Sequence, residues 1–192
     1  TSARERRADR SALLLLCVVS VASHVALDFT NDYGVHPLSP FVNAWYYGDT
    51  VFIIEPWLWV VAVPMILRGT ERGVTRAVLW LVLLLGLALC FLVPYVAREL
   101  AVIVTGGALL WVWLSGRVSR RMAPLCGIAA WLVVTSMFVA GTRTIRAQVA
   151  SAQQVAGVTD GARLVDMVTS PSPANPLCAR VITIETTPDT YR

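Results

Sequence analysis

The chain has 192 residues, of which 56% are hydrophobic and only 15% charged, with a mean hydropathy of +0.64. Soluble domains carry about 25% charged residues, so this composition excludes a disordered chain, a nucleic-acid-binding domain and an ordinary soluble enzyme. All 16 basic residues are arginine, and none lies between Arg10 and Arg68, a stretch that contains both histidines and four carboxylates. Such a stretch is suited to binding a cation.

Five apolar runs follow one another along the chain, each long enough, or nearly so, to cross a bilayer about 30 Å thick. They span residues 11–27, 51–67, 75–93, 96–114 and 123–140. The second run contains Glu55 followed by Pro56, and also Pro64, which predicts a kinked or broken helix. Residues 1–141 are therefore expected to form an all-α integral membrane domain with about five transmembrane helices.

From Gly141 onward the chain becomes more polar. Residues 142–156 predict a helix with a polar face, and residues 157–161 predict a turn. Two strands are expected at 164–170 and 179–186, separated by the breaking segment 171–176. We interpret residues 142–192 as the start of a small, incomplete extracytoplasmic α+β segment.

The distribution of arginines predicts how the chain is oriented. With a cytoplasmic N-terminus, the cytoplasmic segments contain ten arginines and the two opposite loops contain only Arg98. Because cytoplasmic loops carry an excess of basic residues, we expect a multi-pass protein with its N-terminus in the cytoplasm and the lipid bilayer as its partner. The stretch without arginine then has its polar part on the extracytoplasmic side.

Three polar side chains near the end of the first run share a helical spacing. His24, Asp28 and Asp32 are four residues apart, which places them on one helix face, with Asn31 beside them and Gly34 as the helix stop. An imidazole and a carboxylate one turn apart suit a divalent metal, with zinc the best candidate. The other interpretation is a histidine bonded to a backbone carbonyl, with Asp28 in solvent.

Two further carboxylates lie before and inside the second run. Asp49 is interpreted either as part of the site or as the N-cap of a helix that starts at Val51. Glu55 lies among apolar residues, where an unpaired carboxylate is costly. We expect Glu55 to be protonated, to meet a cation or donor from another helix, or to orient a metal-binding histidine. His36 is interpreted as a loop histidine rather than a ligand.

The stretch from Ser23 to Trp59 resembles the core signature of bacterial membrane-bound metal-dependent hydrolases of the YdjM type. That pattern runs His-x-x-x-Asp, a turn ending in Tyr-Gly, a Pro-Phe loop, Tyr-Gly-Asp and Phe-Ile-(Asp/Glu)-Pro-Trp. The matching residues are His24, Asp28, Asn31, Tyr33, Gly34, Pro40, Phe41, Tyr47, Gly48, Asp49, Phe52, Ile53, Glu55, Pro56 and Trp57. Residues 173–176 also resemble a Pro-x-Asn-Pro element that precedes a strand in family members.

This resemblance implies a protein of the bacterial inner membrane, distantly similar to zinc-dependent phospholipase C and P1 nuclease, in which several helices supply the metal ligands. It implies His24 and Asp28 as metal ligands, and Asn31, Asp49 and Glu55 as signature polar residues. Further upstream family elements, including His-x-x-x-His-Ser, are absent here, so we expect this chain to hold half of the site. The predicted metal ligands are His24, Asp28, Asp32 and Asn31, and the predicted catalytic residues are Asp49 and Glu55.

The leading functional prediction is a membrane-bound metal-dependent hydrolase. A metal-activated water would attack a phosphoester or related ester, such as a lipid, at the extracytoplasmic interface, with a carboxylate as general base. The alternative is a non-enzymatic transport or regulatory protein that binds cations or protons through Asp28, Asp49 and Glu55, and the proline after Glu55 favours it. A third interpretation is a structural anchor for the C-terminal segment.

Overall fold

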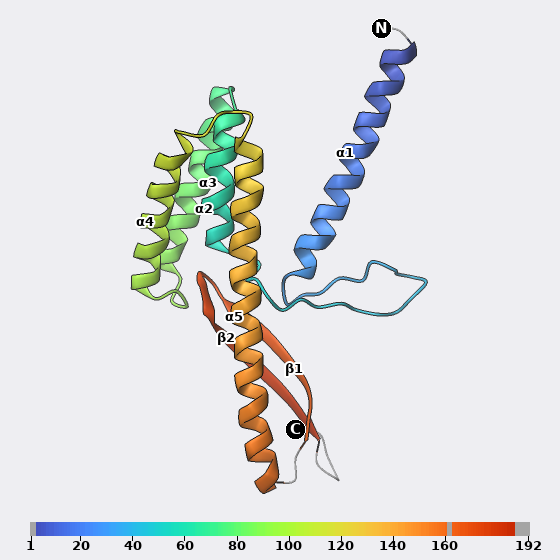
Figure 1. The fold of residues 1–192 in the computed structure, drawn as a ribbon, viewed down its shortest axis with the longest axis vertical. Coiled ribbons are helices and arrows are strands. Elements are labelled where there is room, and N and C mark those ends of the chain that lie inside the picture. The colour runs from blue at the N-terminus through green and yellow to red at the C-terminus, as the bar shows by residue number, and fades with distance from the viewer. Residues whose placement is uncertain (1–2, 161–162, 187–192) are drawn as a thin grey trace.

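Five helices and a β-hairpin make up the fold of the computed structural model, which describes residues 3–160 and 163–186 (Figure 1). The elements are α1 (Ala3–Phe29), α2 (Pro56–Gly69), α3 (Gly73–Leu92), α4 (Arg98–Ser115), α5 (Ala123–Asp160), β1 (Arg163–Ser172) and β2 (Asn175–Thr186). All the helices except α2 contain a stretch long and apolar enough to cross a membrane. The prediction of a mostly helical membrane protein with a small α+β tail is confirmed.

The helix in the second apolar run is shorter than predicted, because it begins at Pro56 rather than at Val51. Residues 51–55 are not helical, and α2 begins at Pro56, where the fixed φ of proline favours a helix start. Its 14 residues extend about 21 Å, less than the hydrocarbon thickness of a bilayer. Glu55 is the N-cap of this helix and therefore lies outside it, in the connector from α1.

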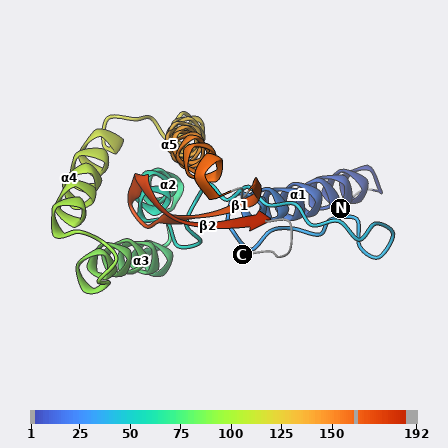
Figure 2. The same cartoon turned by 90° about the horizontal axis from the view of Figure 1, so that it is seen from below.

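Helix α2 is the centre of the bundle. It packs against α3, α4 and α5, and the hairpin crosses beneath it (Figure 2). Val60, Val63 and Leu67 of α2 belong to the main buried cluster together with residues of α3 and α4. Trp57, at the start of α2, packs so closely on Gly107 of α4 that a Cβ at this glycine would lie 2.9 Å from the indole ring.

Helix α1 stands apart from this bundle (Figure 1). None of its side chains from Asp9 to Phe29 is buried. The connector of residues 30–55 links its lower end to α2. The helix is therefore positioned by this connector rather than by packing against the other helices.

The loops are segregated between the two ends of the molecule. The start of α1, the α2–α3 loop and the α4–α5 loop lie at one end, which we call the arginine-rich end (Figure 1). It carries Arg68, Arg72, Arg76, Arg117, Arg120 and Arg121 in or beside those two loops. The connector, the α3–α4 loop and the hairpin lie toward the opposite end, which we call the hairpin end.

Helix α5 extends beyond the bundle and supports the hairpin. It runs without interruption through residue 141, where a domain boundary was predicted, to Asp160. The predicted turn at 157–161 is wrong for residues 157–160, which continue the helix, and Gly161 lies outside the described residues. The apolar run of α5 continues directly into this extension, where Arg143, Thr144 and Gln148 are exposed but Thr142 is buried.

The two strands pair with each other in antiparallel register, for example Val168 opposite Ile182. The predicted breaker at 171–176 is narrower in the structure, because Pro171 and Ser172 belong to β1 and Asn175 and Pro176 belong to β2. The reversal is made by Pro173 and Ala174, the latter with a φ of 63°. Ala174 is 1% exposed and belongs to the main buried cluster, so the hairpin turn is part of the bundle core.

Candidate functional site

His24 and Asp28 form a pair on the last turns of α1. His24 Nε2 lies 3.3 Å from Asp28 Oδ2, and their side chains are 78% and 46% exposed. The i, i+4 spacing on the helix brings the two groups together, as predicted. Neither side chain is buried by the residues that the structure describes, so the pair is open to a ligand.

The predicted continuation of this pair to Asp32 is wrong, because α1 ends at Phe29. Thr30 donates its hydroxyl to the carbonyl of Leu27 at 2.6 Å, and the chain then leaves the helix. Asn31 caps the exit: its Oδ1 accepts the N–H of Tyr33 at 2.9 Å in a local turn that asparagine favours. Asp32 therefore lies in the connector and not on the face that carries His24.

The connector folds back so that its two ends lie side by side. The N–H groups of Thr50 and Val51 both donate to the carbonyl of Thr30 at 2.8 Å, and the N–H of Asp49 donates to the carbonyl of Asn31 at 3.3 Å. Gly48 fits only because it has no side chain, since a Cβ would overlap the carbonyl oxygen of Phe29. This pairing brings Asp49 beside residues 31 and 32, although 17 residues separate Asp49 from Asp32 in sequence.

Asp49 is held by partners from α5 and β1. Its Oδ2 accepts Arg146 Nη1 at 3.3 Å and the N–H of Thr169 at 3.4 Å. The residue is 4% exposed, and burial raises the pKa of its carboxyl, which the Thr169 N–H and the Arg146 guanidinium partly offset and the nearby Asp32 raises further. Its other oxygen, Oδ1, is buried and accepts no hydrogen bond among the described residues.

The structure gives Asp49 a different local role from the N-cap that was one of its two interpretations. No helix starts at residue 51 in the described chain, so Asp49 caps nothing. Its φ of 50° is in the left-handed region, which aspartate and asparagine adopt more readily than most residues. This backbone conformation turns the carboxylate toward Arg146 and the hairpin.

Glu55 joins the start of α2 to the hairpin turn. Its Oε1 accepts the N–H of Trp57 at 3.2 Å, and its Oε2 accepts the N–H of Ala174 at 3.1 Å. The indole of Trp57 in turn donates to the carbonyl of Ala174 at 3.1 Å. Glu55 is 1% exposed, and burial raises the pKa of its carboxyl to about 7 despite these two hydrogen bonds. A donor was expected from another helix, but the structure supplies it from the hairpin turn, as the backbone N–H of Ala174.

His36 lies away from the carboxylates, in the connector. Its Nε2 is 3.0 Å from the carbonyl oxygen of Val42, and its ring stacks on Trp45 with centroids 4.9 Å apart. These contacts fit the interpretation of a loop histidine.

The polar residues thus fall into three groups rather than one cluster. His24 and Asp28 form the first, Asp32 and Asp49 with Arg146 the second, and Glu55 with Ala174 the third. Across residues 3–160 and 163–186, no group of three or more His, Cys, Asp or Glu side chains lies close enough to hold a metal ion. A catalytic zinc takes three protein ligands, so His24 and Asp28 fit two of the required positions and the described residues do not complete the set.

The partners of the two buried carboxylates of the connector, Asp49 and Glu55, could not be found by inspecting the stretch without arginine. Arg146 is 97 residues from Asp49, and Ala174 is 119 residues from Glu55. One signal was present: the cost of burying a carboxylate alone indicated that Glu55 needs a partner, which was expected from another helix. Nothing local indicated that the donor would come from the tail.

The seat of the hairpin on α5 depends on Gly141. A Cβ at this position would overlap the carbonyl oxygen of Pro176 in β2. We expect Gly141→Ala to cost about 1–3 kcal/mol, because neither backbone can give way without displacing the hairpin. Thermal unfolding and the rate of proteolysis within the hairpin of the purified protein would measure this.

The matched control is Gly106→Ala in α4, where a Cβ would meet nothing within 4 Å. Alanine stabilises an open helical position by about 1 kcal/mol relative to glycine, so this variant should melt at or above the wild-type temperature. Equal melting temperatures for the two variants would show that the hairpin does not pack closely against Gly141.

In a comparison with protein families, residues 2–100 match the family described as YdjM inner membrane protein. The matched region contains α1, the connector, α2 and α3, and therefore His24, Asp28, Asp49 and Glu55, but not Arg146 or the hairpin. No curated protein and no solved structure matches the chain. Because the match covers just over half of its 192 residues, the chain belongs to the YdjM inner membrane protein family.

Proposed function

We propose that this multi-pass inner membrane protein is a metal-dependent hydrolase to which the chain contributes a two-residue metal half-site. The observation that carries the proposal is the His24–Asp28 pair, with 3.3 Å between Nε2 and Oδ2 and both side chains open to a ligand. An imidazole nitrogen and a carboxylate oxygen are both ligands that zinc prefers. The other ligands come from outside the described residues.

A divalent metal at this pair would act as a Lewis acid toward a phosphoester or related ester. Asp49 is the better candidate for the general base. Its raised pKa favours taking up a proton, and its Oδ1 is not engaged by any described residue. Both oxygens of Glu55 accept backbone N–H groups, so we assign Glu55 to positioning the start of α2 and the hairpin.

The proposal includes an orientation. The N-terminus and the arginine-rich end face the cytoplasm, since basic residues accumulate on that side of inner membrane proteins. The end of α1 that carries His24 then faces away from the cytoplasm, together with the connector and the hairpin.

The test is zinc binding by the purified full chain, measured by calorimetry. We expect His24→Ala and Asp28→Ala each to weaken zinc binding by about tenfold or more, because each removes one ligand. His36→Ala is the matched control, since His36 is occupied by Val42 and Trp45, and it should leave the affinity unchanged. Equal zinc affinity in all four proteins would show that the ligand assignment is wrong.

A proton- or cation-binding protein that uses Asp28, Asp49 and Glu55 is the second candidate. The burial of Glu55 with a pKa of about 7 favours it, because such a carboxyl changes its charge near neutral pH. The two candidates differ in their need for metal. Zinc-dependent hydrolysis of a phosphodiester that disappears in His24→Ala supports the hydrolase, whereas zinc-independent proton flux into proteoliposomes supports the second candidate.

A further inference from the structure

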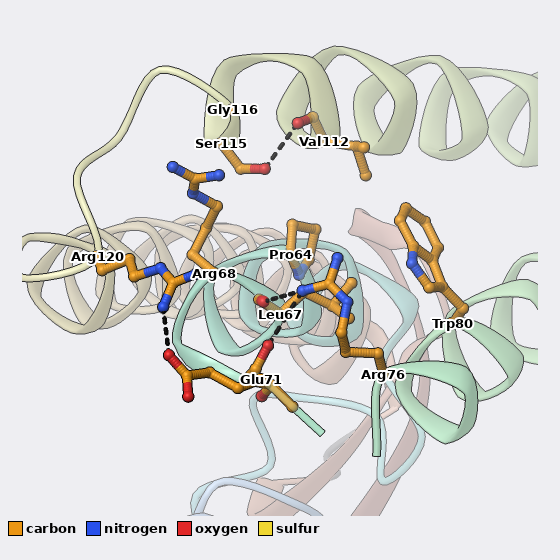
Figure 3. A pocket seen from close by; sticks show the side chains of 11 residues that line it. Pro64, Leu67, Arg68, Glu71, Arg76, Trp80, Val112, Ser115, Gly116 and Arg120 are labelled. Atoms are coloured by element: carbon orange, nitrogen blue, oxygen red, sulfur yellow. Dashed lines mark hydrogen bonds and ion pairs between the residues drawn. The ribbon is translucent and has the colours of Figure 1, made fainter. Parts of the chain in front are cut away.

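The arginine-rich end contains a cavity that the proposed hydrolase does not use. It has a volume of about 590 Å³ and lies between the ends of α2, α3 and α4. Figure 3 shows that three arginine side chains reach it from three different parts of the chain. Arg68 comes from the last turn of α2, Arg76 from the first turn of α3 and Arg120 from the α4–α5 loop.

Two of these arginines are held in place without being neutralised. Arg68 donates Nε and Nη2 to the carbonyl of Val118 at 3.2 and 2.9 Å. Arg76 donates Nη1 to the carbonyls of Leu67 and Thr70 at 2.9 and 3.1 Å. A carbonyl oxygen carries no net charge, and a guanidinium has five N–H donors. Each group therefore keeps its positive charge and unused donors while its position is fixed.

The one carboxylate in the lining of the cavity compensates little of this charge. Glu71 accepts Arg120 Nη1 at 2.6 Å, but the two side chains are 77% and 65% exposed. Exposed ion pairs of this kind contribute little because water screens them. Three guanidinium groups against one carboxylate leave the cavity positively charged, which favours an anion.

The uncharged part of the lining combines the hydroxyl residues Thr70 and Ser115 with several apolar side chains. Pro64, Leu67 and Val112 form part of the wall, and the indole of Trp80 stands at its side (Figure 3). Tryptophan is enriched at the boundary between headgroups and acyl chains, and guanidinium groups suit phosphate because they bind it in a bidentate fashion. The cavity therefore matches an amphipathic ligand with a phosphate at one end.

We propose that this cavity binds the phosphate of an anionic phospholipid. The phosphate lies among Arg68, Arg76 and Arg120, and the acyl chains extend past Trp80 along the lipid-facing surface of α3. Basic pockets between membrane helices are known to accept lipid headgroups in this way. The site is at the opposite end of the molecule from His24 and Asp28, and it stands whether or not the chain is a hydrolase.

The test is native mass spectrometry of the purified full chain, titrated with phosphatidylglycerol, phosphatidylcholine or inorganic phosphate. We expect phosphatidylglycerol to bind about tenfold more tightly than phosphatidylcholine, whose choline group cancels the charge of the phosphate. The double variant Arg68→Gln/Arg76→Gln should lose about tenfold or more in affinity for phosphatidylglycerol, since charge-assisted hydrogen bonds are lost.

The matched control is Arg72→Gln/Arg121→Gln, which removes the same charge from the same end at exposed residues that do not line the cavity. It should change the affinity by about twofold at most. Equal losses in the two double variants would overturn the proposal, because lipid would then respond only to the overall charge.

A second variant keeps the test valid if the loss of Arg68 and Arg76 unfolds the protein. Glu71→Gln removes the exposed carboxylate that competes for Arg120, so it should strengthen phosphatidylglycerol binding by about two- to threefold. Unchanged or weaker binding overturns the proposal. If inorganic phosphate binds as tightly as phosphatidylglycerol, the cavity is a site for free phosphate and the lipid assignment is wrong.

Discussion

Arg146→Met is expected to lower the free energy of unfolding by about 3 kcal/mol. The substitution keeps an unbranched apolar stem in place of the arginine stem but removes the cation 3.3 Å from Asp49 Oδ2 and the donor to the carbonyl of Met167 at 2.9 Å. Asp49 is 4% exposed, so its carboxylate would be left buried without a counter-charge. The expected loss is at the low end for a buried pair, because the Arg146 side chain is 40% exposed and water can partly replace it.

The melting temperature of the purified protein in detergent would measure this effect. For a chain of this length, about 3 kcal/mol corresponds to a decrease of about 6–12 °C. Arg143→Met is the matched control, since Arg143 lies one turn earlier on α5 and is exposed, and it should melt within about 2 °C of wild type.

A double variant separates the loss of the pair from the loss of packing. Asp49→Asn removes the charge, keeps the shape and suits the left-handed backbone at this position. Asp49→Asn/Arg146→Met should therefore be more stable than Arg146→Met alone, because no buried charge remains. If the double variant loses the sum of the two single effects, the ion pair does not couple α5 to the connector.

Sequence reasoning predicted the helices well because each one has a strong local signal. The runs that became α3 and α4 were placed within about two residues at each end, a usual uncertainty for helix boundaries. The first run was recognised, but its helix begins earlier, at Ala3. The additional residues are mostly charged, and a helix can continue through charged residues once it has left the bilayer. The start of α2 was misplaced by five residues, although Pro56 marked it, because the preceding residues are as apolar as the helix itself.

It was harder to predict which polar groups lie together, because their arrangement depends on tertiary contacts. The spacing of His24 and Asp28 predicted their contact, since one helix determines it. The spacing of Asp32 could not show that α1 ends at Phe29, three residues before it. The counter-charge of Asp49 and the donor to Glu55 come from α5 and from the hairpin turn. No local pattern predicts where a hairpin of the tail will dock.

The contact of Glu55 with Ala174 has a consequence for the docking of the hairpin. Each oxygen of the carboxyl accepts a backbone N–H, one from α2 and one from the turn of the hairpin. The connector thus contributes two of the contacts that hold the hairpin, one at this turn and one at Asp49, where the N–H of Thr169 donates. Both contacts are made by carboxyl groups of the connector. The position of the hairpin therefore depends on the residues between α1 and α2.

The stability of the protein is expected to decrease as the pH rises from about 5 to about 8, opposite to the usual effect of a paired carboxylate. Burial raises the pKa of Glu55 from 4.5 to about 7. In this interval the folded protein holds a proton that the unfolded chain releases, so the stabilisation is complete below about pH 4.5 and is lost as the pH passes 7. The difference amounts to about 3 kcal/mol, or about 6–12 °C in melting temperature.

Glu55→Gln tests this directly, because glutamine has the size of glutamate and cannot ionise. The variant should melt above the wild-type protein at about pH 8 and at or below it at about pH 5, so that the difference between the two proteins changes with pH. Glu71→Gln is the control for the Glu-to-Gln change itself, because its carboxylate is 77% exposed at the arginine-rich end. A constant difference between Glu55→Gln and wild type would show that Glu55 is ionised in the folded protein at both pH values, and that the two backbone N–H groups outweigh its burial.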